Sequence, residues 1–126
     1  MRALIAVTAI AVCGLAAVPA GADRFLPEPT NCSYTTHHVF HHGDGRTSEI
    51  RVTYTSQRFT TCDSARTIAH AWASTAGCHD TRYCNVYHDS YSCKNTFYSN
   101  GSPIAHCTAL HGAIGEVFMS WHRINT

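Results

Sequence analysis

Two stretches of alternating residues predict a β-hairpin near the start of the chain. Residues 34–41 read YTTHHVFH and residues 49–54 read EIRVTY, and such period-two alternation is typical of strands with one buried face. Gly43-Asp44-Gly45 lies between them and suits a tight turn in which glycine accepts positive φ. Closing the hairpin on this turn predicts four inward-facing pairs: Tyr34–Tyr54, Thr36–Val52, His38–Ile50 and Phe40–Ser48.

Apolar residues at helical spacing predict an amphipathic helix over residues 63–76. Its apolar stripe consists of Ala65, Ile68, Ala69, Trp72 and Ala76. Thr60, with Asp63 three residues later, resembles a capping box, and Gly77 is suited to the C-terminal end. Trp72 is the one large side chain of the stripe, and we expect it to be the main contact between the helix and the core.

The remainder of the chain predicts short strands, at about residues 83–88, 104–108 and 116–124. In the last of these, Val117, Met119 and Trp121 alternate with other residues and share one face. Together with the hairpin and the helix, these strands predict an α+β fold, in which one amphipathic helix packs on a small antiparallel sheet.

The first 22 residues have the pattern of a secretory signal peptide. Arg2 is followed by a long apolar run and by Ala20-Gly21-Ala22, which offers small residues at the cleavage site. The run is short for a transmembrane anchor, which needs about 20 apolar residues. We therefore expect a secreted, extracellular protein with a signal peptide at 1–22, a loose leader at 23–31, a single disulfide-bonded domain at 32–126 and no membrane span in its mature form.

The charge of the mature chain limits its possible partners, and its cysteine content predicts disulfides. The 126-residue chain has nine Lys and Arg and eight Asp and Glu, and removal of the first 22 residues removes Arg2. The mature chain then has eight basic and eight acidic side chains and a formal net charge of zero. A neutral chain argues against a nucleic-acid partner, so the expected partner is extracellular or in the cell envelope. Removal of Cys13 leaves six cysteines, an even number that predicts three disulfides in a short secreted chain. They are Cys32, Cys62, Cys78, Cys84, Cys93 and Cys107.

The pairing of these cysteines is open, with one exclusion. Cys62 and Cys78 flank the predicted helix, whose fourteen residues would span about 21 Å. A disulfide needs Cα atoms within about 7 Å. We therefore expect Cys62 to pair with a cysteine of the later strands, with Cys107 preferred over Cys93.

Several segments resemble small secreted, disulfide-bonded proteins of actinobacteria, mycobacteria included. The matching features are the strand IRVTY, the cysteine in TTCDSAR, the Ala-rich helix ARTIAHAWA and the terminal strand EVFMSW. The resemblance covers about the last 75 residues and rests mainly on Cys62, Ala65, Arg66 and the terminal strand. These proteins have no assigned activity, so the resemblance implies a fold and an extracellular location only.

A histidine-rich segment suggests a metal site. It contains His37, His38, His41 and His42, and neutral imidazole is a common ligand of zinc, copper and nickel. On a regular strand, His37 and His41 share a face but lie about 13 Å apart. A distorted hairpin end would let His41 and His42 converge, and these two are the candidate ligands of a divalent metal. No other cofactor is expected.

A secreted ribonuclease is a second alternative. The segment Cys93-Lys94-Asn95-Thr96-Phe97 looks like a shortened form of the pancreatic ribonuclease signature C-K-x-x-N-T-F. That resemblance implies that Lys94 stabilises charge on a phosphate while His70 and His122 exchange protons. Two residues of that signature are missing from this segment.

The main expectation is a non-enzymatic extracellular binding or interaction protein. The mature chain shows no hydrolase or phosphate-loop motif. Aromatic side chains could supply a recognition surface, although packing against disulfides is the more ordinary role. These residues are Trp72, Trp121, Tyr83, Tyr87, Tyr91 and Tyr98.

Overall fold

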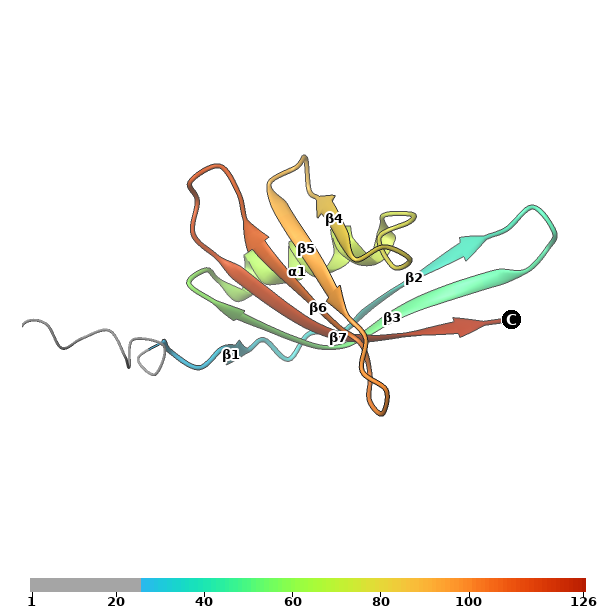
Figure 1. Ribbon diagram of the computed structural model, residues 1–126, viewed down its shortest axis with the longest axis horizontal. Coiled ribbons are helices and arrows are strands. Elements are labelled where there is room, and N and C mark those ends of the chain that lie inside the picture. The colour runs from blue at the N-terminus through green and yellow to red at the C-terminus, as the bar shows by residue number, and fades with distance from the viewer. Residues whose placement is uncertain (1–25) are drawn as a thin grey trace, which may run out of the picture.

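The computed structural model describes residues 26–126, in which a seven-stranded antiparallel sheet packs one of its faces against a single helix (Figure 1). The elements are β1 (Thr30–Asn31), β2 (Thr36–His41), β3 (Thr47–Arg58), α1 (Cys62–Ser74), β4 (Tyr83–Val86), β5 (Tyr91–Thr96), β6 (Ile104–Ala109) and β7 (Glu116–Asn125). The strand order is β1-β3-β7-β6-β5-β4, and β2 pairs with the same edge of β3 as β1. This confirms one helix on a small antiparallel sheet, with strands making up more of the fold than the helix.

Two segments of the predicted domain organisation need comment. The predicted signal peptide, 1–22, and the first residues of the leader lie outside the described residues. Later in the predicted leader, Thr30 and Asn31 form β1 and pair with Gln57 and Ser56 of β3. In the part of the chain that the structure describes, no helix is long and apolar enough to cross a membrane.

The β2–β3 hairpin has the predicted register over most of its length. Thr36 pairs with Val52, His38 with Ile50 and Phe40 with Ser48. Beyond Val52 the prediction is wrong, because β3 contains a bulge between Val52 and Tyr54 in its pairing with β7. One extra residue reverses the alternation of a strand. Tyr54, expected inside, is therefore 44% exposed.

Helix α1 lies close to its predicted position, with small differences at both ends. It begins at Cys62, and its N-cap is Thr61 rather than Thr60, with Thr61 Oγ1 accepting a hydrogen bond from the Ser64 amide at 3.1 Å. The helix ends at Ser74, before Ala76, and Ala76, which was predicted to belong to the apolar stripe, is exposed. Ala73 is buried instead.

The core lies between α1 and the sheet. Trp72 is fully buried, as predicted. Its ring meets Trp121 of β7 with the ring centroids 5.1 Å apart. Val117, Met119 and Trp121 are all buried on the face that meets the helix, which confirms their shared orientation.

The three expected disulfides are present, and they join Cys32 to Cys62, Cys78 to Cys84 and Cys93 to Cys107. The exclusion of a Cys62–Cys78 bond is confirmed, but the expected Cys62–Cys107 bond is wrong. Cys32 continues the pairing of β1 with β3 through a 2.9 Å hydrogen bond from its amide to the Thr55 carbonyl, which brings it to the start of the helix. Cys107 of β6 instead pairs with Cys93 of β5, a strand that the sequence did not predict.

Candidate functional site

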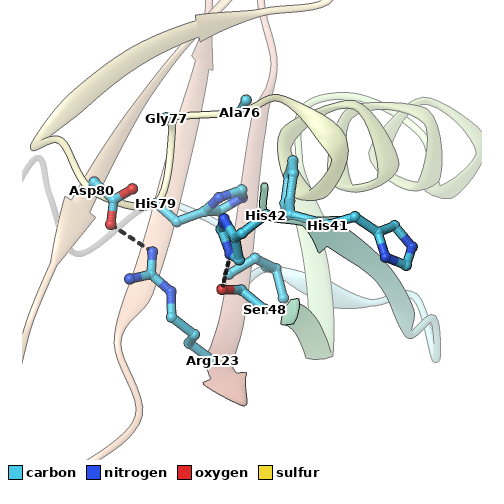
Figure 2. A pocket seen from close by; sticks show the side chains of 10 residues that line it. His41, His42, Ser48, Ala76, Gly77, His79, Asp80 and Arg123 are labelled. Carbon is cyan, nitrogen blue, oxygen red and sulfur yellow. Dashed lines mark hydrogen bonds and ion pairs between the residues drawn. The ribbon is translucent and has the colours of Figure 1, made fainter. Parts of the chain in front are cut away.

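A cavity of about 340 Å³ opens on the helix side of the sheet, near the end of the β2–β3 hairpin. It is bounded by the hairpin, by the loop that follows α1 and by the last part of β7 (Figure 2). Phe40, Ile50 and His79 form its more buried wall. The volume lies within the range of small-molecule sites, which makes this cavity the candidate functional site.

His79 is the most unusual polar group in the cavity. Its side chain is enclosed by Trp72, Trp121 and Phe40, with ring centroids 4.5, 5.8 and 5.6 Å away, and the residue is only 4% exposed. Its Nε2 lies 3.0 Å from the carbonyl oxygen of Trp72. A carbonyl oxygen can only accept a hydrogen bond, so Nε2 carries the hydrogen.

The remaining ring nitrogen of His79 is therefore an acceptor. Among residues 26–126, Nδ1 has no hydrogen-bond partner, and it is not one of the fully buried unpartnered atoms, so it is accessible from the cavity side. Burial lowers the pKa of His79, and the positive charge of Arg123 lowers it further, against the opposing effects of the Trp72 carbonyl and Asp80. A neutral ring near pH 7 thus presents an unused acceptor beside the cavity.

Arg123 brings a permanent positive charge to the cavity, and the carboxylate of Asp80 partly balances it. Arg123 projects from β7, and its Nη2 donates to Asp80 Oδ1 at 2.7 Å across the mouth of the cavity (Figure 2). Both side chains remain partly exposed. A guanidinium has five N–H donors, so one bond to Asp80 leaves donors that a bound anion can use.

The predicted metal ligands His41 and His42 both line this cavity. His42 Nε2 lies 2.7 Å from the hydroxyl of Ser48, while the ring of His41 points away from that pair (Figure 2). Nowhere in residues 26–126 do three His, Cys, Asp or Glu side chains come together as a metal site would require. The divalent-metal hypothesis stays a prediction.

The residues of the ribonuclease alternative are dispersed. His70 lies on α1, with its Nδ1 3.4 Å from the hydroxyl of Thr36. His122 alternates with the buried Trp121 and so faces the opposite side of the sheet. Lys94 is paired with His106 rather than with either of them. Asn95 of the same motif is buried and donates to the carbonyls of Cys78 and Thr81, which is a structural role.

Sequence reasoning identified none of His79, Asp80 and Arg123 as site residues. His79 and Asp80 belong to the disulfide-linked loop after α1, and Arg123 belongs to the terminal strand β7. They come together only when these two segments pack against each other. The one available signal was the position of His79 directly after Cys78, because cysteine is among the residues most often buried. Of the aromatic residues proposed as a surface, Trp72 and Trp121 are buried, Tyr91 is half-buried, and Tyr83, Tyr87 and Tyr98 are exposed.

Comparisons of the chain with protein-family models, with curated proteins and with solved structures find no match. The family resemblance expected from the sequence therefore stays a prediction, and the geometry of the cavity is the basis for a functional assignment.

Proposed function

We propose that this chain is a secreted, extracellular binding protein whose ligand is a small organic anion held in the cavity beside His79. The observation that carries the proposal is the unpartnered Nδ1 acceptor of a nearly buried histidine, with the guanidinium of Arg123 at the same cavity. Three disulfides and a signal-like N-terminus support an extracellular location, because disulfides persist in oxidising compartments.

The walls of the cavity define the chemistry of the ligand. Nδ1 of His79 requires a hydroxyl or N–H group as donor, and Arg123 favours a carboxylate, which it can hold by charge-assisted hydrogen bonds. Phe40 and Ile50 line the same cavity and supply apolar surface, which suits a hydrocarbon body. A hydroxy-substituted aromatic carboxylate combines all three features.

The test uses 4-hydroxybenzoate, benzoate and phenol as matched probes. We expect 4-hydroxybenzoate to bind most tightly, because benzoate lacks the donor and phenol lacks the carboxylate. An NMR titration that observes the ring signals of His79 would show binding at the proposed nitrogen. Arg123→Gln should weaken binding of 4-hydroxybenzoate about tenfold or more, the magnitude expected for a charge-assisted hydrogen bond.

Arg46→Gln is the control, because Arg46 lies at the tip of the hairpin and does not line this cavity. Thermal unfolding of both variants establishes that they remain folded. Equal affinity for the three probes, or equal loss in the two arginine variants, would overturn the proposal.

A further inference from the structure

The sheet has a second surface, on the side opposite α1, which we call the open face. Tyr83 of β4, Lys94 of β5, His106 of β6 and Phe118 of β7 are successive cross-strand partners. Directly paired residues project to the same side of a sheet, and Phe118 alternates with the buried Val117 and Met119. These four side chains therefore form one row across the open face. In residues 26–126, the one helix contacts the opposite face (Figure 1).

A polar network fixes the middle of this row. Glu116 accepts a hydrogen bond from Arg58 Nε at 2.7 Å and lies 2.9 Å from Nε2 of His106. The His106 ring stacks on Phe118 with centroids 4.3 Å apart, and the Arg58 guanidinium lies 5.4 Å from the centre of the same ring. These contacts hold the central side chains in place before any ligand binds.

Exposed tyrosines lie at both ends of the network. Tyr83 is 59% exposed on β4, and the bulge in β3 turns Tyr54 outward beside Phe118. Four strand spacings separate β3 from β4 through β7, β6 and β5, or about 19 Å at about 4.8 Å each. Two stacking surfaces at that separation fit an extended polymer better than a single small molecule.

Away from the β3 end, where Glu28 lies beside Tyr54 and Phe118, the charge of the open face is positive. Glu116 is paired with Arg58, whereas Lys94 and Arg82 form no ion pair among residues 26–126. Arg82 also lies over the Tyr83 ring, 5.8 Å from its centre. A second row of cross-strand partners lies next to the first and consists of Asn85, Ser92, Thr108 and Glu116. The side chains of Asn85, Ser92 and Thr108 can each donate and accept hydrogen bonds.

We propose that the open face binds an acidic polysaccharide, a chain of sugars that carry carboxylates. The tyrosines stack on sugar rings, the row of Asn85, Ser92 and Thr108 bonds to hydroxyl groups, and Lys94 and Arg82 attract carboxylates. A nucleic acid fits less well, because its binding depends on neutralising many phosphates and this face offers two unpaired cations. The site is on the opposite side of the sheet from the cavity and does not depend on it.

The experiment measures binding to polygalacturonate, to neutral dextran and to polyuridylate by affinity electrophoresis. We expect retardation by polygalacturonate that weakens as salt is added, since charge attraction is screened, and little retardation by the other two polymers. Tyr83→Ala should reduce the affinity about fivefold, as expected for loss of one stacking contact, and Lys94→Gln should reduce both the affinity and its salt dependence.

The control is Tyr87→Ala. Tyr87 is 48% exposed but lies beside Asp63 and Thr67 of the helix, away from the open face. Retardation by dextran equal to that by polygalacturonate, tighter binding to polyuridylate, or the same loss in Tyr87→Ala would overturn the proposal. Arg123→Gln should bind polygalacturonate normally, so the failure of one proposed site is distinguishable from the failure of the other.

Discussion

The two faces of the sheet come from the same strands and yet hold their side chains in different ways. Along β7, Val117, Met119 and Trp121 are excluded from water by α1, whereas Glu116 and Phe118 lie on the open face in contact with Arg58 and His106. The first group gains stability from burial of apolar surface. The second has hydrogen bonds and ring contacts that remain partly hydrated. Alternate residues of β7 therefore have different roles. Those that face α1 stabilise the fold, and those on the open face remain accessible at the surface.

The largest expected effect is on the helix side. Trp72→Ala should lower the free energy of unfolding by about 3–5 kcal/mol, because it leaves a cavity beneath the helix. Phe118→Ala, which removes an aromatic ring from the open face, should cost less than half as much. Urea unfolding of both variants measures the difference. Similar losses would show that the two faces do not differ in the way described.

The disulfides should differ according to the length of chain that each encloses. The Cys32–Cys62 bond closes a separation of 30 residues, and the Cys78–Cys84 bond closes one of 6. Replacing Cys32 and Cys62 together by Ser should therefore cost about 2–4 kcal/mol, and replacing Cys78 and Cys84 should cost less. Thermal unfolding of the two double variants, each keeping the other bonds, tests this order.

Acid should act first on the helix side, through His79. Its pKa is lowered by burial, so the unfolded chain binds this proton more readily than the folded protein. The stability that it contributes is present above its unfolded value of about 6.5 and is lost as the pH falls toward the folded pKa. His79→Phe should flatten the unfolding free energy between about pH 6.5 and 5, as urea unfolding across this range would measure.

The open face should respond to acid in a lower range and more weakly. The hydrogen bond from Arg58 lowers the pKa of Glu116, with a smaller contribution from His106. Its stabilising contribution is present above the unfolded value of about 4.5 and is lost as the pH falls through the folded pKa. Glu116→Gln should remove this loss below about pH 4.5 and leave the His79 transition intact. Loss of the upper step in Glu116→Gln, or of the lower step in His79→Phe, would contradict the assignment of the two groups.

Local patterns predicted much of the hairpin and the helix. The pairing of His38 with Ile50 followed from alternation and a glycine turn, and the burial of Trp72 followed from helical spacing. The outward turn of Tyr54 did not follow, because a bulge depends on pairing with β7 and not on the residues of β3 alone. Strand β5 was missed because its sequence YSCKNT is polar, and its inward positions are a disulfide cysteine and the buried Asn95.

The candidate site was predictable only in part. His41 and His42 were identified from their clustering, and both line the cavity. His79 and Arg123 are 44 positions apart in the sequence and meet only when the loop after α1 folds against β7. No spacing rule connects such residues, and the partner of Cys32 was missed for the same reason.

The order of the disulfides has a consequence for how the chain can be assembled. Among the described residues, the first cysteine bonds to the second, the third to the fourth and the fifth to the sixth. The three closed loops therefore neither overlap nor enclose one another. A chain whose cysteines are oxidised in order from the N-terminal side would form each native bond between two consecutive cysteines, without later rearrangement. Any one loop can also be opened without unlinking the other two.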